Sequence, residues 1–346
     1  MTRDFSSLLE EALSAQGLSA DSARAAFDAL FAGSWSTTQV ASLLVALRAR
    51  GESAEVIAAA AQAMRAAMIP VPHQLAKVLD TCGTGGDGSG TVNLSTGAAI
   101  IVAGAGIPVA KHGNRAISSK AGSADVLSAL GIPLDLTAEQ AQIVLERAKI
   151  AFLLAPTHHP AMRHAMPARK ELGVRTLFNC LGPLTNPARA THQVIGVFAD
   201  HLRPILANTL AQLGSQAAWI VHGRDGLDEV SPYGPTRVSE LRAGKIQELE
   251  IAPEDFGIPC SAPGAARGGD AQENAAIIEQ VLSNQKHPAT NAFVLNAAAA
   301  LVVAEGLDPK KAAARAREII ETRAALAVLD RWRSVCRDLK AQTDAS

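Results

Sequence analysis

Aromatic residues are scarce in this chain of 346 residues, at 3% of the total. Single-stranded nucleic acid binds largely by stacking its bases on aromatic side chains, so a site of that kind is not expected. Charge of one sign is lacking as well, because 32 Lys and Arg residues stand against 33 Asp and Glu residues. Duplex-binding proteins usually present a basic surface. We therefore expect no nucleic-acid partner.

Cysteines and long apolar runs are also few. The longest uncharged apolar stretch, residues 98–110, is shorter than the roughly 20 residues that a membrane span requires. Acidic residues occupy the start of the chain, where a signal peptide needs an apolar run. The cysteines are widely spaced without a CxxC pair, which argues against a disulfide framework and a zinc ribbon: Cys82, Cys180, Cys260 and Cys336. We expect a cytoplasmic protein that binds no membrane.

The chain is long enough for about two domains, and its first part is helical in pattern. Apolar residues recur at helical spacing near the start. Ser36 and Gln39 have the spacing of a capping box, and Ser53 begins an alanine-rich helix that ends before Pro70. We predict that residues 1–70 form a helical N-terminal domain.

The residue pattern changes after residue 72, where short β-branched runs alternate with helical patterns. Such alternation is typical of an α/β domain with a mostly parallel central sheet, and we assign it residues 73–346. The predicted strands are 107–110, 150–154, 193–198 and 217–221, with a hairpin at 237–241 and 245–251. The predicted helices are 123–130, 137–148, 160–171 and 203–213, followed by a loop at 257–269 and a helical region over 270–339.

The segment from Asp80 to Thr96 is the most informative, because its five glycines in eight positions allow a close approach to the backbone. A dinucleotide site also needs an acidic residue about 20 positions later, and none occurs between Asp87 and Asp125. A Walker loop is excluded because no Gly-Lys-Ser/Thr follows. The hydroxyls and amide at 91–96 suit an anion at a helix N-terminus. A purely structural turn is the alternative.

A basic segment, residues 111–120, follows the predicted strand at 107–110. Ligands bind beyond the carboxyl ends of strands in open α/β sheets, and three cations with several hydroxyls would make a phosphate cradle. A solvated basic loop is the alternative.

Two adjacent carboxylates, Asp228 and Glu229, follow the predicted strand at 217–221. Taken alone they are typical of an exposed acidic loop. Beside a bound pyrophosphate they would instead require a divalent cation, and Mg²⁺ is usually held by one or two carboxylates together with substrate phosphates.

Arg169 lies on a predicted helix with one apolar side, where its guanidinium could hold a substrate carboxylate at two points. A surface ion pair with Glu171 or a neighbouring residue is an equal alternative. The histidines at 158, 159 and 164 lack the spacing of a zinc motif, and no nucleophile elbow is present.

Several motifs together resemble the anthranilate phosphoribosyltransferases, a family of tryptophan biosynthesis. The similarity extends over nearly the whole chain, with the family's order and spacing. Its motifs are Gly83-Thr-Gly-Gly-Asp87, Asn93-Leu-Ser-Thr96, Lys111-His-Gly-Asn114, Arg175-Thr-Leu-Phe-Asn179, Gly182-Pro-Leu-Thr-Asn-Pro187 and Asp225-Gly-Leu-Asp-Glu229.

This resemblance implies a small helical domain, in which helices near 165–190 join the N-terminal ones. The larger α/β domain would be like that of pyrimidine nucleoside phosphorylases and other phosphoribosyltransferases. It also implies a homodimer formed through the helical domain.

The resemblance further implies three sets of site residues. The donor, phosphoribosyl pyrophosphate, would be held by Gly83, Gly86, Asp87, Thr91, Asn93, Leu94, Ser95, Thr96, Lys111, His112, Gly113, Asn114, Arg115, Ala116, Ile117, Ser118, Ser119 and Ser123. Anthranilate would contact Gly83, Asn114 and Arg169, and two Mg²⁺ ions would be held with Ser95, Asp228 and Glu229.

The implied reaction transfers the phosphoribosyl group of the donor to the amine of anthranilate and releases pyrophosphate. No side chain is assigned as general base, since an arylamine is already nucleophilic at neutral pH. A nucleoside phosphorylase of the same architecture, and a phosphate-sensing module without turnover, remain as alternatives.

Overall fold

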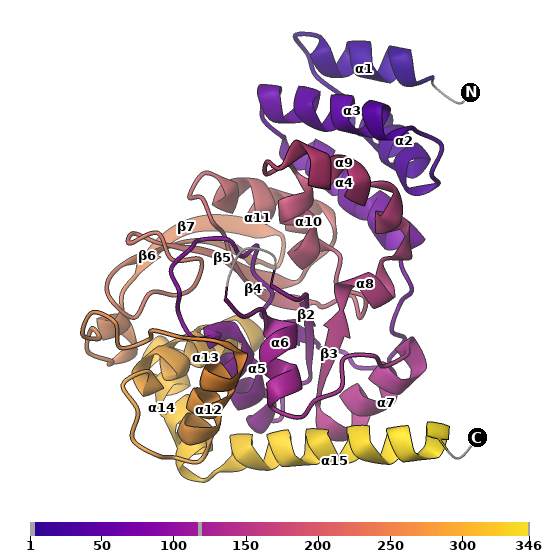
Figure 1. The fold of residues 1–346 in the computed structure, drawn as a ribbon. Coiled ribbons are helices and arrows are strands. Elements are labelled where there is room, and N and C mark those ends of the chain that lie inside the picture. Colours follow the sequence, from indigo (N-terminus) through magenta and orange to yellow (C-terminus); the bar gives the residue numbers. More distant parts are fainter. Residues whose placement is uncertain (1–3, 117–119, 345–346) are drawn as a thin grey trace.

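The computed structural model describes residues 4–116 and 120–344 and places the first helices at one end of the molecule (Figure 1). Ser36 and Gln39 form the predicted capping box, and the Ser53 side chain caps the last of these helices. Because these caps satisfy backbone N–H groups at the helix starts, the helices begin where the pattern predicts. They are α1 (Phe5–Leu13), α2 (Ala20–Phe31), α3 (Thr37–Arg50) and α4 (Ala54–Ala67).

Two later helices join this helical domain, as the resemblance implies. α9 (Met166–Leu172) packs on α3, and α10 (Phe178–Leu184) packs on α4 (Figure 1). The single helix predicted at 160–171 is wrong in detail, because a 3-10 helix, η1 (Pro160–His164), precedes α9. Pro167 lies in the first turn of α9, and a proline there cannot donate the bond that would continue an earlier helix.

The α/β domain contains one sheet of seven strands in the order β3-β2-β1-β4-β5-β6-β7. The first five strands in this order pair in parallel, and β6 and β7 form the predicted antiparallel hairpin. The predicted mostly parallel sheet is therefore confirmed. The strands are β1 (Leu79–Asp80), β2 (Val109–Gly113), β3 (Ile150–Leu154), β4 (His192–Gly196), β5 (Ala217–Gly223), β6 (Thr236–Arg242) and β7 (Lys245–Ile251).

Hydrophobic cores lie on both faces of this sheet. Alternate residues of a strand point to opposite faces, so Val194 and Trp219 join one core while Ile195 and Ile220 join the other. The second core is shared with the helical domain, and α11 (Leu202–Gln212) connects the sheet to α4. The sheet is thereby packed directly against the helical domain.

The first core is built from the remaining helices, with α13 almost wholly buried in its centre. α13 packs on α5 at Gly97, where an added Cβ would lie 2.3 Å from Phe293. A glycine is needed for this close approach, which fixes the position of the start of α5. The helices are α5 (Leu94–Gly104), α6 (Ser123–Ala129), α7 (Ala138–Ala148), α8 (Ala155–His158), η2 (Pro253–Phe256), α12 (Ala271–Leu282), α13 (Thr290–Glu305), α14 (Pro309–Glu321) and α15 (Ala324–Asp344).

No single helix among residues 4–116 and 120–344 is both long and apolar enough to cross a membrane. α13 and α14 meet the length and composition criteria only as a pair, and a bend of 118° separates them.

Candidate active site

The glycine-rich segment begins where β1 ends. β1 is the strand about which the order of the sheet reverses, with β2 on one side and β4 on the other. Ligands of open α/β sheets bind beyond the carboxyl ends of the strands at such a switch point. Residues 81–93, which we call the glycine loop, therefore occupy the position where a ligand is expected.

The backbone of the glycine loop presents a row of hydrogen-bond donors. Four glycines have positive φ, a conformation that residues with a Cβ rarely adopt: Gly85 at 65°, Gly86 at 85°, Gly88 at 73° and Gly90 at 67°. Unpaired N–H groups on such a backbone form an anion-binding surface. Within the described residues, no acceptor is found for the N–H groups of Gly83, Gly85, Gly86, Asp87, Gly88 and Gly90.

Both ends of the glycine loop are tied to neighbouring elements. The N–H of Thr84 donates to the carbonyl of Gly196 at 2.8 Å, and the Thr84 hydroxyl accepts from the N–H of Phe198 at 3.1 Å. At the other end, the N–H of Gly268 donates to the carbonyl of Gly90 at 2.9 Å. The loop is thus held at its ends while its middle residues stay open.

Asn93 precedes the first turn of α5 and is held from two sides. Its side-chain oxygen accepts from Asn274 at 2.9 Å, and its amide donates to the carbonyl of Ala121 at 3.3 Å. The next turn is linked to the acidic pair, because the N–H of Ser95 donates to Glu229 Oε1 at 3.2 Å. The predicted helix start at 91–96 is therefore confirmed, with Asn93 as its N-cap.

The other polar residues of this helix start lie in different environments. Thr96 is fully buried, and its hydroxyl has no hydrogen-bond partner within the described part of the chain. Leu94 is also fully buried, so only its backbone is available to a ligand. Thr91 lies at the loop surface and forms an isolated β-bridge with Arg267.

The first two cations of the basic segment at 111–120, Lys111 and Arg115, lie in different surroundings. Lys111 and His112 belong to β2 and are buried, so the expectation that they lie in a loop was wrong. Lys111 Nζ donates to the Thr81 carbonyl at 3.4 Å and to the hydroxyls of Thr81 and Ser95 at 3.3 Å. The strand was predicted at 107–110, but β2 begins at Val109. Pro108 precedes it, and a proline has no N–H to donate to the neighbouring strand. Lys111 therefore links the start of the glycine loop, at Thr81, to the first turn of α5, at Ser95.

The described residues just beyond β2 contact the start of α6. Arg115 forms an ion pair with Asp125 at 3.3 Å, and the Ala116 N–H donates to the same carboxylate at 2.9 Å. These contacts begin at Gly113, where an added Cβ would lie 2.4 Å from the Ser123 hydroxyl. Asn114 belongs to the same segment. Three of the expected donor residues, Ile117, Ser118 and Ser119, lie outside the described residues.

The acidic pair faces the glycine loop, as the magnesium hypothesis requires. The N–H of Asp228 donates to Asp87 Oδ2 at 3.3 Å. Removal from water, reinforced by the Glu229 and Asp87 carboxylates, raises the pKa of Asp228 well above its usual value. Removal from water also raises the pKa of Glu229 to about 7, although Lys111 opposes the shift.

These surroundings fit a hard cation completed by a ligand. Carboxylates held close together without a counter-charge are stabilised by a divalent cation, and Mg²⁺ takes oxygen ligands. No group of three or more His, Cys, Asp or Glu side chains in residues 4–116 and 120–344 forms a metal site by itself. Mg²⁺ commonly keeps only one or two protein carboxylates and takes the rest from phosphate and water. Asp228, Glu229 and the Ser95 hydroxyl would supply the protein oxygens.

Arg169 belongs to α9, in the helical domain. Its guanidinium carbon lies 5.3 Å from the centre of the Phe178 ring. Burial lowers its pKa. It forms no ion pair with any described residue, so the alternative of a pair with Glu171 is wrong. A half-buried guanidinium without a carboxylate is available to a substrate anion.

Other residues of the site were missed by the sequence analysis. Gly196 is one, because an added Cβ would lie 1.5 Å from the carbonyl oxygen of Asp228. Asn274 is another, because it is buried and its side-chain amide donates to Asn93. Arg175 belongs to a motif of the resemblance but received no role, although its side chain donates to the carbonyl of Gly86 at 2.6 Å.

Comparison with known proteins gives the same architecture. Residues 6–68 match the helical bundle domain of a glycosyl transferase family, and residues 75–326 match its a/b domain. A curated anthranilate phosphoribosyltransferase of Rhodopseudomonas palustris is 48% identical over 327 residues, which cover 94% of this chain and 96% of that protein. The chain belongs to the anthranilate phosphoribosyltransferase family. The expected helical and α/β domains are those of this family.

Two solved structures of the family are similar over the whole fold. The anthranilate phosphoribosyltransferase of Thermus thermophilus has a TM-score of 0.90 and 42% identity, covering 95% of this chain and 99% of that one. The enzyme of Saccharomyces cerevisiae, solved in complex with PRPP and Mg, has a TM-score of 0.88 and 30% identity. The match covers 96% of this chain and 98% of that one.

Proposed function

We propose that this chain transfers the phosphoribosyl group of phosphoribosyl pyrophosphate to the amine of anthranilate, giving N-(5-phosphoribosyl)anthranilate and pyrophosphate in tryptophan biosynthesis. The observation that carries the proposal is the open row of N–H groups in the glycine loop, which lies at the switch point of the sheet with the acidic pair beside it. An anion-binding backbone next to two carboxylates suits a pyrophosphate bound together with a divalent cation. Membership of the family supports the same reaction.

The donor-binding residues are proposed from this arrangement. The N–H groups of Gly83, Gly86 and Asp87 face the pyrophosphate, and the helix start at 93–96 adds its partial positive charge. Lys111 lies beneath this surface and supports it through Thr81 and Ser95. The donor residues at 111–119 and Ser123 complete the proposed site.

Magnesium is the proposed cofactor, held with Ser95, Asp228 and Glu229, and two ions would be bound. When bound, Mg²⁺ supplies charge neutralisation to the pyrophosphate. The relative from Saccharomyces cerevisiae was solved with PRPP and Mg. In this chain, the half-buried acidic pair would hold the cation beside the glycine loop, and the Ser95 N–H holds Glu229 in place.

Anthranilate is the proposed acceptor, contacted by Gly83, Asn114 and Arg169. The Arg169 guanidinium would grip its carboxylate, which turns the amine toward the donor. The amine attacks the anomeric carbon while the bond to pyrophosphate breaks, and the amine then loses a proton to solvent. Catalysis is therefore mostly positioning and charge neutralisation.

The reaction is tested by incubating the protein with phosphoribosyl pyrophosphate, Mg²⁺ and anthranilate and following the loss of anthranilate fluorescence. We expect loss that depends on donor, metal and protein together. Phosphorolysis of a pyrimidine nucleoside, with no loss of anthranilate, would favour the phosphorylase alternative. Donor binding without either turnover would favour a phosphate-sensing module.

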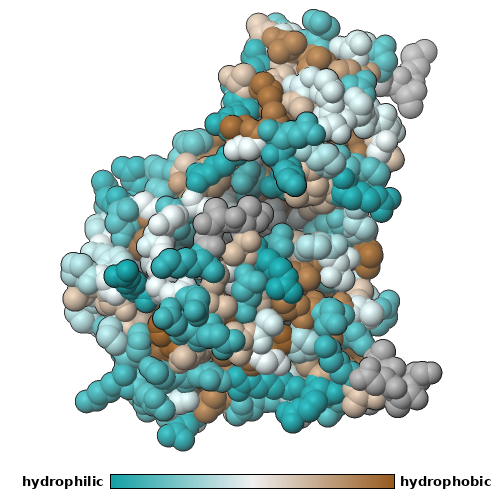
Figure 2. All heavy atoms as spheres, in the orientation of Figure 1, coloured by the Kyte–Doolittle hydropathy of each residue, from teal (hydrophilic) through white to brown (hydrophobic). Residues whose placement is uncertain are grey.

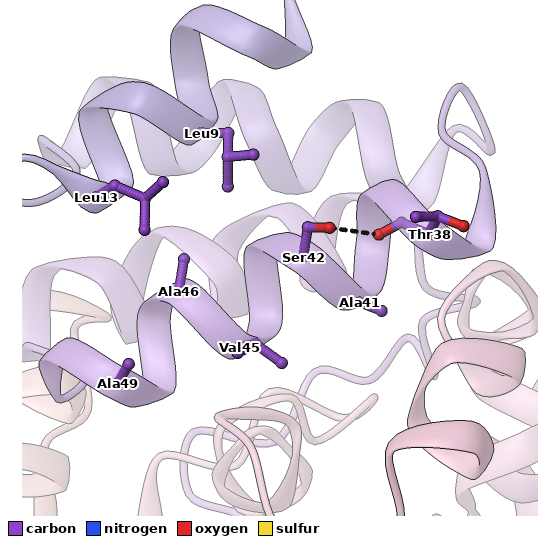
Figure 3. Close-up of a pocket in the computed structure, with 8 residues that line it drawn as sticks. All are labelled: Leu9, Leu13, Thr38, Ala41, Ser42, Val45, Ala46 and Ala49. Carbon is purple, nitrogen blue, oxygen red and sulfur yellow. Dashed lines mark hydrogen bonds between the residues drawn. The ribbon is translucent and has the colours of Figure 1, made fainter.

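A homodimer is the proposed assembly, formed through α1 and α3. Hydrophobic residues gather on the surface of the helical domain (Figure 2), and a second copy of this chain would cover them. Leu13 is 57% exposed and Val45 47% exposed. These helices enclose an apolar groove (Figure 3), which is lined by Leu9, Leu13, Thr38, Ala41, Ser42, Val45, Ala46 and Ala49.

Light scattering after gel filtration tests this assembly. Val45→Asp should convert the dimer into a monomer, because it places a charge in an apolar interface. Ile69→Asp is the matched control, since Ile69 is an exposed apolar residue outside the groove. A wild-type monomer would refute the proposal.

The domain boundary and the location are also part of the proposal. We place the boundary between residues 70 and 73, and the family matches at 6–68 and 75–326 support it. A cytoplasmic location is supported by four free cysteines, which suit a reducing compartment.

A further inference from the structure

Arg175 connects the helical domain to the glycine loop. It lies between α9 and α10, and its Nη2 donates to the carbonyl of Gly86 at 2.6 Å. Its guanidinium carbon lies 4.2 Å from the centre of the Phe198 ring, beyond the end of β4. Its own carbonyl accepts a hydrogen bond from Arg48 on α3. One side chain therefore contacts the loop while its backbone is held by the helical domain.

The hydrogen bond from Arg175 determines the orientation of the peptide group between Gly86 and Asp87. In a trans peptide the carbonyl and the following N–H point in opposite directions. Because the Gly86 carbonyl points to the guanidinium, the N–H of Asp87 points away from it. This N–H is one of those without an acceptor among the described residues. The bond thus keeps a donor group exposed on the anion-binding surface.

In the middle of the glycine loop, Asp87 accepts hydrogen bonds from the N–H groups of Asp228 and Ser89 through its side chain, whereas the Gly86 carbonyl is bonded by Arg175. Thr84 and Gly90 are tied to neighbouring elements, as described above, but Gly86 lies between these ties. Glycines with positive φ lose much conformational freedom when they are fixed. A contact that fixes Gly86 before a ligand arrives reduces the ordering that binding must supply.

The stack on Phe198 fixes the guanidinium itself. Arginine stacks on aromatic rings and presents its donors in a rigid plane. Phe198 is also tied to the loop, because its N–H donates to the Thr84 hydroxyl. The arginine, the ring and the loop therefore form one connected unit at the carboxyl edge of the sheet.

We propose that Arg175 is a positioning residue that pre-orders the glycine loop for the donor and links the loop to the helical domain. The proposal deepens the proposed function and rests on it for the identity of the donor. Arg175 acts through Gly86 and contributes to donor affinity, whereas the chemical step at saturating donor proceeds without it.

Hydrogen exchange of the ligand-free protein tests the structural part. In Arg175→Met the peptide covering residues 83–90 should exchange at least threefold faster than in wild type at its two bonded amides, Thr84 and Ser89, because freeing the Gly86 carbonyl loosens the loop that holds these bonds. Arg147→Met is the matched control, since Arg147 is an exposed arginine of α7, away from the loop. Unchanged exchange of this peptide in Arg175→Met would overturn the proposal.

Calorimetry with phosphoribosyl pyrophosphate and Mg²⁺, together with steady-state kinetics, tests the functional part. Arg175→Met should raise the donor Kd and KM about tenfold and leave kcat within threefold of wild type. Arg175→Lys should recover part of this loss, because it keeps a donor but not the planar stack. Arg48→Met should have a smaller effect that does not add to that of Arg175→Met.

The outcomes separate the two proposals. A fall in kcat of more than tenfold at saturating donor would assign Arg175 to the reacting groups and overturn the positioning role. Unchanged donor affinity would overturn it as well. Wild-type protein that binds no donor would refute the proposed function, and the exchange experiment would still decide whether Arg175 orders the loop. If Arg175→Met does not fold, Arg175→Lys and Phe198→Leu carry both measurements.

Discussion

Arg169 has the aromatic ring of Phe178 beside its guanidinium and no carboxylate partner among the described residues. Its neighbour on α9, Lys170, is exposed. These two cations are adjacent in the chain but differ in their exposure to solvent. Burial lowers the pKa of Arg169 and leaves its charge with few competing partners, which suits the capture of a small carboxylate.

Arg169→Ala should raise the KM for anthranilate by roughly one to two decades, because a lost charge-assisted contact costs about 1.5–3 kcal/mol. The donor KM should stay near the wild-type value. Steady-state kinetics with each substrate varied in turn measures both. Lys170→Ala is the matched control and should behave as wild type. Loss of donor affinity in Arg169→Ala would place the acceptor site elsewhere.

The acidic pair gives a second prediction for single residues. Asp228→Asn combined with Glu229→Gln should raise the Mg²⁺ concentration for half-maximal turnover about tenfold or more, since neutral amides bind the cation less well. A tenfold change corresponds to about 1.4 kcal/mol. Magnesium titrations of activity measure the shift, with Glu321→Gln, an exposed carboxylate of α14, as the control. An unchanged requirement would refute the metal assignment.

Element boundaries were predicted well where the chain carries local signals. The Ser36 and Gln39 capping box, the β6–β7 hairpin and the helix after Ser53 all follow from short-range chemistry, and all are present. β1 was not predicted, because a strand of two residues is too short to show an alternation of apolar and polar residues. The start of β2 was placed two residues early, since the apolar run includes Ile107 while the ladder begins after Pro108.

Contact between β4 and the segment after β5 gives a prediction for these elements. Gly196→Ala should destabilise the fold by about 1–3 kcal/mol or more, because its Cβ would overlap the Asp228 carbonyl and push the segment after β5 away from β4. It should also raise the magnesium requirement by displacing Asp228. Urea unfolding and magnesium titration measure the two effects.

Gly234→Ala is the matched control for this prediction. A Cβ at Gly234 would meet nothing within 4 Å, and its φ is not positive. The control should unfold like wild type. Equal stability of Gly196→Ala and Gly234→Ala would contradict the close approach seen at Gly196.

Three histidines tie distant parts of the molecule together. His112 of β2 and His159, which precedes η1, stack edge to face with ring centres 5.1 Å apart. His112 Nδ1 lies 2.8 Å from the Gly182 carbonyl of α10, and His158 Nδ1 lies 3.0 Å from the Ile69 carbonyl. Burial lowers the pKa of His112 to about 4 and that of His159 to about 2. Burial lowers the pKa of His158 as well. His112 and His159 are therefore neutral in the folded protein at pH 5 and above.

This cluster predicts a loss of stability in acid. Between pH 7 and pH 5 the unfolded chain takes up protons near its pKa of about 6.5 while the folded imidazoles stay neutral, so the free energy of unfolding falls with pH. In His159→Phe the unfolded chain has one fewer histidine to take up a proton. Between pH 7 and pH 5 the free energy of unfolding of this variant should therefore fall by about 2 kcal/mol less than that of wild type. Urea unfolding at both pH values measures the difference.

An exposed histidine supplies the control for the acid prediction. His201 lies at the surface, so replacing it removes no buried imidazole. His201→Gln should therefore show the wild-type pH dependence. A wild-type dependence in His159→Phe would mean that His159 also takes up its proton in the folded protein.

The site as a whole could be predicted only in part from the chain. The glycine loop and the acidic pair carry composition signals, and the structure brings them together. The contacts of Arg175 with Gly86 and of Asn274 with Asn93 join residues 89 and 181 positions apart. No local period or spacing encodes such contacts, because they arise from how the helical domain and α12 pack on the sheet.

The central claim is tested most directly by ³¹P nuclear magnetic resonance of the protein with phosphoribosyl pyrophosphate, Mg²⁺ and anthranilate. We expect pyrophosphate and a phosphoribosyl product to form in equal amounts, only when anthranilate is present, and we expect chelation of magnesium to stop the formation of both. Release of pyrophosphate without anthranilate, or no reaction of the donor with all components present, would contradict this claim.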